Sequence, residues 1–209
     1  MPEINRKALS HYALAALSGG LLAMSYAMHP LWWAAWLSPA PVIVATLRAP
    51  VASRRWLTLL TGVIGGISSF SYHLTVGGWL AALLILALVT VAWSSAIRLT
   101  VTFAERDRFF PAVLAIPVTW AAIDTFLIHF SPHGSAGSIA YSQMEALPVI
   151  QVASLGGVPA VTFVVLLAGS FLGVLLAVPI AAAIGVVSRF WLRRYLESPL
   201  YLDPPRTGR

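Results

Sequence analysis

Long apolar stretches alternate with short polar connections along most of the 209-residue chain. A helix needs about 20 apolar residues to cross the roughly 30 Å hydrocarbon core of a bilayer. The pattern therefore predicts an all-α integral membrane protein, a bundle of six membrane-spanning helices, at 8–28, 31–47, 56–76, 79–97, 109–130 and 149–178. The second stretch carries Pro39 and Pro41, so we expect it to kink. Neighbouring helices satisfy the carbonyl groups that a proline leaves free.

The two ends of the chain allow alternative interpretations. Arg6 and Lys7 before the first stretch are typical of a signal peptide, but five further apolar stretches favour a retained helix. After the sixth span we expect an amphipathic helix on the inner surface over 180–196. We therefore divide the chain into a transmembrane domain, 1–196, and a disordered polar tail, 197–209, which carries three prolines.

Composition excludes several classes of protein. With 59% apolar and 10% charged residues, the chain is unlike a soluble enzyme. The absence of cysteine excludes disulfides, thiolate zinc sites and a cysteine nucleophile within this chain. The net charge of +6 comes from small clusters separated by apolar stretches, not from a continuous basic face, so we expect no nucleic-acid partner.

The basic residues predict the orientation of the helices. All 13 lie in the N-terminal segment, in 48–55, in 98–108 or after residue 188, and none lies in 29–30, 72–78 or 131–148. Cytoplasmic loops of membrane proteins carry an excess of Lys and Arg. The alternation predicts that both ends are cytoplasmic, in a multi-pass protein of the bacterial inner membrane.

One acidic residue lies inside a predicted span. Asp124 is about 9 Å from the outer end of 109–130 at 1.5 Å per residue, and a carboxylate at such a depth normally faces a bundle interior or a wet cavity. We expect its partners among residues of the third span, Ser68, Ser69, Tyr72 and His73. Asp124 then either lines an outward-opening polar cavity or holds two helices together by a hydrogen bond.

The long outer connection, 131–148, carries most of the remaining candidate residues. It either contacts lipid as a recognition loop or serves as a spacer, and Ile139, Tyr141, Met144 and Leu147 are the side chains expected in the headgroup layer. Pro132 breaks the helix that would bring His129 and His133 to one face, so we expect no metal site and no cofactor. The candidate lipid or substrate contacts are Asp124, His129, His133, Tyr141, Ser142, Gln143 and Glu145.

Three motifs carry a resemblance to a known family. Trp120-x-x-x-Asp124 is followed by Gly137-Ser-Ile-Ala-Tyr-Ser-Gln143, and then by an apolar segment that begins Pro148-Val-Ile-Gln and continues to Phe163. This ordered set resembles the N-terminal membrane domain of apolipoprotein N-acyltransferase. The resemblance covers 118–163 by motif, and elsewhere it extends only to hydropathy and span order.

The resemblance implies a two-step acyl transfer. An acyl chain passes from a phospholipid to a cysteine thiol, and then to the amino group of a diacylated lipoprotein cysteine. In the family, a glutamate, a lysine and a cysteine of an extracytoplasmic nitrilase-like domain carry this chemistry. This chain has no such segment, and Leu127 stands where the resemblance implies a basic residue. We therefore assign it no catalytic residue and expect it to be inactive alone.

Three functions remain open from the sequence. The first is the membrane part of a lipoprotein N-acyltransferase, truncated or completed in trans by a nitrilase-like catalytic chain. The second is a non-catalytic lipid-binding or scaffold protein. The third is a small transporter in which Asp124 and the outer histidines line a path, although the chain lacks the paired interrupted helices of inverted repeats.

Overall fold

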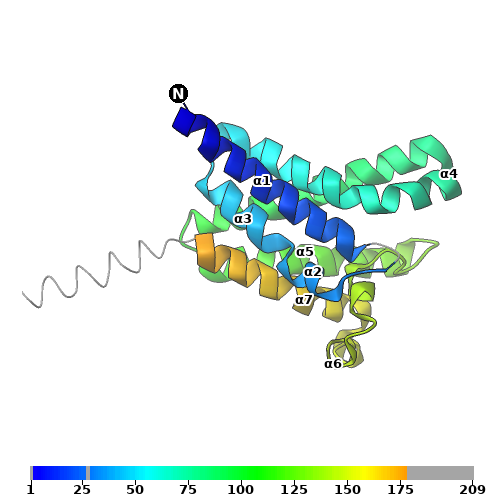
Figure 1. Cartoon of the computed structure of the whole chain (residues 1–209). Coiled ribbons are helices and arrows are strands. Elements are labelled where there is room, and N and C mark those ends of the chain that lie inside the picture. Colours follow the sequence, from blue (N-terminus) through cyan, green and yellow to red (C-terminus); the bar gives the residue numbers. More distant parts are fainter. Residues whose placement is uncertain (1, 27–28, 178–209) are drawn as a thin grey trace, which may run out of the picture. The chain divides into compact units, whose positions relative to one another are not determined.

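The computed structural model describes residues 2–26 and 29–177, and within these ranges the structure is entirely helical (Figure 1). The elements are α1 (Pro2–Ser25), α2 (Trp32–Leu37), α3 (Pro39–Arg48), α4 (Val51–Ala104), α5 (Phe109–Phe130), the 3₁₀ turn η1 (Ile139–Gln143), α6 (Leu147–Ile150) and α7 (Ala153–Ala177). The predicted segments 180–196 and 197–209 lie outside the described residues.

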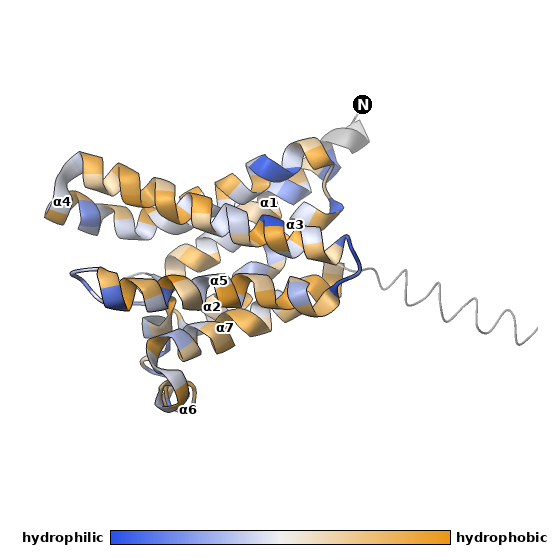
Figure 2. Cartoon of the chain, turned by 180° about the vertical axis from the view of Figure 1, so that it is seen from behind, coloured by the Kyte–Doolittle hydropathy of each residue, from blue (hydrophilic) through white to orange (hydrophobic). Residues whose placement is uncertain are grey.

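Four of these helices are long and apolar enough to cross a membrane: Arg6–Ser25, Val51–Ala104, Phe109–Phe130 and Ala153–Ala177. In Figure 2 hydrophobic residues cover much of the sides of the helices, and hydrophilic residues lie mainly towards the helix ends. Such a surface suits lipid, because the exposure of apolar side chains to water is unfavourable. The chain is therefore a membrane protein by composition and architecture.

The predicted kink in 31–47 lies at Ser38, where the backbone stays in the helical region and the N–H still donates to the carbonyl of Ala34. α2 and α3 are separate short helices that meet at Ser38, and Pro39 is the first residue of α3. Proline favours this first position because its missing N–H would have no partner there in any case. Neither α2, with 6 residues, nor α3, with 10, is long enough to span a membrane by itself.

α4, which is 54 residues long, contains both predicted spans, 56–76 and 79–97. Its backbone leaves the helical region at Gly78, where φ is 73°, a conformation that favours glycine. The chain turns back there: Gly62 lies against Thr90, and Gly66 lies against Leu86. α4 is thus a helical hairpin, and its two limbs pack through the small residues of the first limb.

Interhelical contacts define the relative directions of the other helices. Ala15 and Leu22 of α1 contact Thr61 and Gly65 of α4 in the same order, so α1 and the first limb run parallel. In the same way, Gly169 of α7 contacts Pro39, and Gly173 contacts Ala40 and Ile43. These close approaches, which have no room for a Cβ atom, are the small-residue packing that membrane helices use.

The core lies where α1, α3, α4, α5 and α7 meet. Its largest fully buried side chains include Trp93, Leu22, Ile43, Leu57, Ile97 and Ile116. The rings of Trp93 and Trp120 are 4.7 Å apart and join the second limb of α4 to α5. Trp120 is one helical turn from Asp124, so this aromatic pair fixes the helix that carries the buried carboxylate.

Candidate site at the end of the bundle without basic residues

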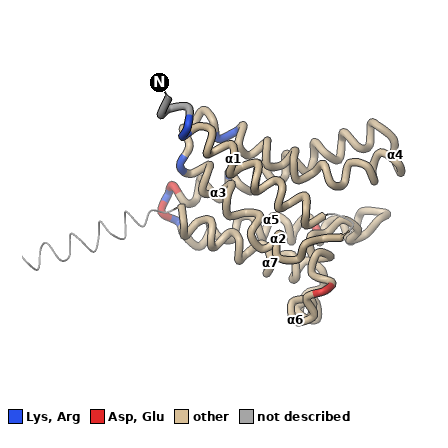
Figure 3. Tube along the Cα trace, in the orientation of Figure 1, with Lys and Arg blue, Asp and Glu red and all other residues tan. Residues whose placement is uncertain are grey.

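The described Lys and Arg residues gather at the end of the bundle that carries the N-terminus (Figure 3). Two contacts join helix ends there: the guanidinium of Arg54 lies 2.5 Å from the carboxylate of Glu105, and Arg48 donates a 2.9 Å hydrogen bond to the carbonyl of Leu176. We call the opposite end, where α1 and α5 finish and α4 turns at Gly78, the outer end.

Asp124 forms a buried anchor at the outer end. Its Oδ2 accepts hydrogen bonds from Ser138 Oγ at 2.7 Å and from Thr162 Oγ1 at 2.5 Å. The two hydroxyl oxygens are 3.0 Å apart, and Ser138 Oγ also accepts a bond from the backbone N–H of Ala140. A single carboxylate oxygen thus links α5, α7 and the start of η1.

These partners correct the sequence-based expectation, which placed the partners of Asp124 in 56–76. Ser68 and Ser69 instead donate to backbone carbonyls of their own helix, and His73 Nδ1 lies 2.8 Å from the carbonyl of Ser69. Intrahelical bonds of this kind satisfy hydroxyl groups inside an apolar bundle without a second helix. Of the two interpretations of Asp124, a link between helices describes the geometry.

Gln143 forms a second anchor at the other end of η1. Its side-chain oxygen accepts a 2.9 Å bond from the indole N–H of Trp36, and its amide nitrogen donates to the carbonyl of Trp32 and to Ser142 Oγ. Ser142 Oγ in turn donates to the carbonyl of Ile139. The Gln143 side chain has no exposed surface, so its amide belongs to the framework that attaches η1 to α2.

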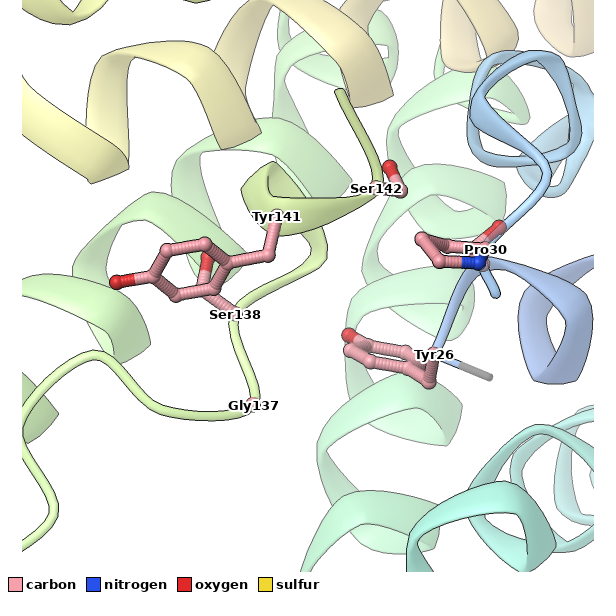
Figure 4. Close-up of a pocket in the computed structure, with 7 residues that line it drawn as sticks. Tyr26, Pro30, Gly137, Ser138, Tyr141 and Ser142 are labelled. Carbon is pink, nitrogen blue, oxygen red and sulfur yellow. The ribbon is translucent and has the colours of Figure 1, made fainter. Parts of the chain in front are cut away.

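Cavities lie between η1 and the connection that joins α1 to α2. One, of about 170 Å³, is lined by Ser25, Tyr26, Pro30, Gly137, Ser138, Tyr141 and Ser142. In Figure 4 the hydroxyl of Tyr26 points towards the segment that carries Gly137 and Ser138. A larger cavity, of about 510 Å³, shares Pro30, Tyr141 and Ser142 with it, and is completed by His29, Leu31, Met144 and Glu145.

The seven candidate residues from the sequence separate into three groups. Tyr141, Ser142 and Glu145 line the larger cavity. Asp124 and Gln143 do not line it; their side chains anchor the two ends of the η1 segment to helices. His129 and His133 are exposed outside it; the ring of His129 bonds to the carbonyl of Thr125, and the backbone of His133 bonds to Ser131.

Several residues of the site carry no signal in the sequence. Tyr26 and Pro30 come from a connection more than a hundred residues before η1, and nothing in their own sequence context indicates that they face Ser138 or Tyr141. Thr162 lies within the third of the three motifs, but its hydrogen bond to Asp124 joins α7 to α5, which the motif itself does not indicate. In the sequence, such bonds between helices are indicated only by Ser and Thr residues within apolar helices.

The lining of the cavities offers both polar and apolar groups to a ligand. The cavities are lined by hydroxyl groups, apolar side chains, His29 and Glu145, and the sequence has no cysteine. Among the described residues, no group of three His, Asp or Glu side chains is placed to hold a metal ion. The larger cavity, of about 510 Å³, lies within the range of roughly 300–1,000 Å³ that is typical of small-molecule sites.

Comparisons with known proteins agree with the motifs. The sequence model of the apolipoprotein N-acyltransferase N-terminal domain matches residues 18–171. The apolipoprotein N-acyltransferase of Geobacter metallireducens is 26% identical over 181 residues, which cover 80% of this chain. The matched region is 34% of the length of that relative, so this chain spans about a third of it. No solved structure matches the chain.

Proposed function

Because the chain belongs to the apolipoprotein N-acyltransferase N-terminal domain family, we propose that it is the membrane-embedded part of a lipoprotein N-acyltransferase. It binds the lipid portion of a substrate at the outer end, and a nitrilase-like catalytic domain, in a second chain or in further sequence, carries out the acyl transfer. The substrates are a phospholipid acyl donor and the N-terminus of a diacylated lipoprotein.

The observation that carries this proposal is the cavity of about 510 Å³ beside η1. Tyr141, Ser142 and Glu145 line it; Tyr141 and Ser142 belong to the Gly137–Gln143 motif, and Glu145 follows two residues after it. The anchors at Asp124 and Gln143 hold this segment against two different parts of the bundle. A rigid frame of this kind favours binding, because less conformational freedom is lost when a ligand arrives.

The proposed topology has six crossings of the bacterial inner membrane, with both chain ends in the cytoplasm. α4 supplies two of the crossings as a hairpin, and α2 with α3 supply one. The contacts Arg54–Glu105 and Arg48–Leu176 support this count, since they bring helix ends from three predicted cytoplasmic connections together. The Lys and Arg distribution supports the orientation.

Topology can be tested directly because the chain has no cysteine. Arg106→Cys and His133→Cys place a single thiol in a predicted inner and a predicted outer connection. In intact spheroplasts, a membrane-impermeant maleimide is expected to label His133→Cys and to label Arg106→Cys only after lysis. Labelling of both positions before lysis contradicts the proposed orientation.

Binding is tested with a photoreactive phospholipid at low molar ratio to the detergent-solubilised chain. We expect label in the peptide that contains Tyr141 to Glu145, competition by unlabelled phospholipid, and weaker labelling in Tyr141→Ala. Leu88→Ala, on the exposed face of the second limb of α4, is the matched control. Labelling that no phospholipid displaces would remove the site.

The catalytic half of the proposal has a separate test. The chain alone is expected to give no lipoprotein N-acylation in a conditional acyltransferase mutant, and co-expression with a nitrilase-like partner is expected to restore it. Specific lipid labelling without complementation by any partner favours the non-catalytic lipid-binding protein, since the cavity lining contains no cysteine.

A further inference from the structure

Residues 144–157 follow η1, and we call them the lobe. Val149, Val152 and Ala153 pack against the core, while other side chains of the lobe are exposed. None of the four α6 residues is buried. Met144, Leu147 and Leu155 are 58%, 67% and 86% exposed. Exposed large apolar side chains grouped in one segment indicate a surface that something apolar covers.

Backbone hydrogen bonds close several turns of the lobe and join its start to η1. The N–H of Ala146 donates to Gln143, that of Val149 to Ala146, and that of Gln151 to Leu147. Further on, Ser154 donates to Gln151 and Leu155 to Val152. Turn bonds of this kind occur in loops in water as well. They also suit a segment at the edge of the hydrocarbon, where each unpaired backbone group is costly.

The lobe projects sideways from the helices near the outer end in both views of the molecule (Figures 1 and 2). Gly156 and Gly157 have non-helical backbone angles, and Gly157 has a φ of 67°. This break turns the chain from the lobe into the regular part of α7, which begins at Val158 and Pro159. The lobe therefore lies across the direction of the helices, as a segment in the plane of a membrane surface does.

The charge of the lobe selects the kind of surface. Its single charged residue is Glu145, which lines the larger cavity, and it contains no Lys or Arg. Anchors for anionic lipid carry basic residues on the polar face. The lobe has apolar contact alone, which suits a zwitterionic phospholipid surface.

We propose that the lobe inserts Leu147 and Leu155 into the outer membrane leaflet, at the boundary between headgroups and acyl chains, and forms the side wall through which lipid reaches the larger cavity. Met144 belongs both to the exposed apolar group and to the lining of that cavity. A lipid headgroup beside the lobe thus has a short lateral path to Tyr141 and Ser142. The inference rests on the proposed function for its orientation and for the lipid that uses the path.

The test measures depth with a polarity-sensitive fluorophore on single cysteines in the full chain, reconstituted in phosphatidylcholine vesicles. Leu147→Cys and Leu155→Cys are the reporting positions. Leu88→Cys, on the lipid-facing side of α4, is the deep control, and Arg106→Cys, in an exposed connection, is the aqueous control. Quenchers are lipids with a nitroxide near the headgroup, lipids with a nitroxide near the chain end, and iodide in the buffer.

We expect both lobe labels to be quenched more by the shallow nitroxide than by the deep one, and far less by iodide than the label at Arg106→Cys. Quenching by iodide equal to that of the aqueous control overturns the inference. Protection from all three quenchers also overturns it, since it indicates that protein covers the lobe. Depth is read from quenching of the lobe labels and does not depend on occupancy of the cavity, so a failed depth test and a failed lipid-labelling test are distinguishable.

Discussion

Residues 138–143 and residues 144–157 are consecutive in the chain, yet they have opposite relations to the bundle. In the first segment Ile139 and Gln143 are almost completely buried, and polar bonds attach both of its ends to helices. In the second, Leu147 and Leu155 are exposed, and most backbone bonds close local turns within the segment. Polar residues fix the buried segment, and apolar residues cover the exposed one.

This contrast reverses the usual arrangement of a protein in water and has a direct physical reason. Inside a membrane bundle, lipid is as apolar as the core, so apolar side chains gain little by turning inward. Hydrogen bonds between helices then hold irregular backbone in place. We therefore expect substitutions of the two anchors to lower stability, and substitutions of the exposed Leu147 and Leu155 to leave it nearly unchanged.

Asp124→Ala is expected to have the largest effect. It removes the shared acceptor and leaves the hydroxyls of Ser138 and Thr162 in a buried site, at about 1–3 kcal/mol for each group that stays unpaired. Denaturant unfolding in mixed micelles measures the loss. Asp124→Asn keeps a side-chain oxygen as acceptor and is the control; equal losses in the two variants would show that the bonds contribute nothing.

Gln143→Leu is expected to come next. The substitution keeps the volume roughly constant but removes the bonds to Trp36, Trp32 and Ser142, and leaves the indole N–H of Trp36 without its partner. The loss should be about 1–3 kcal/mol. Trp36→Phe removes the same N–H together with part of the ring volume, and is the partner variant. In a double-mutant cycle the two losses should be less than additive, because they delete the same bond; full additivity contradicts the contact.

Thr162→Val tests one arm of the Asp124 anchor. The side chain keeps its shape and loses its hydroxyl, while Ser138 still donates to Asp124. Hydrogen bonds between membrane helices average about 0.6 kcal/mol in double-mutant cycles, and we expect a loss of that size. Thr119→Val, whose hydroxyl bonds to the carbonyl of Ala115 in its own helix, should change stability less. The reverse order would count against the anchor.

Leu155→Ser should have the smallest effect on stability. The side chain is 86% exposed, and exposed substitutions away from special contacts usually stay within about 0.5 kcal/mol. The same substitution in Leu166, which is fully buried, is the contrasting control and should be strongly destabilising. A large loss of stability in Leu155→Ser would mean that the Leu155 side chain packs against the bundle.

Local sequence was sufficient to predict most helices, because each spanning segment must by itself supply about 20 apolar residues. α5 coincides with the predicted span 109–130, and the predicted turn between 76 and 79 is the reversal at Gly78. Glycine at the turn and the small residues facing Thr90 and Leu86 are features of the sequence itself. The charge alternation predicts the orientation, which stays a prediction.

The contents of the site were decided by tertiary structure. Asp124 was correctly singled out as a buried acid, but the prediction of its partners on the third span was wrong. Ile139, expected in the headgroup layer, is instead 1% exposed in the core. Tyr26 joins the cavity from the far end of α1. A hydrophobic pattern states that a residue is inside the membrane, but which polar groups meet there depends on how helices distant in sequence rotate and pack against one another.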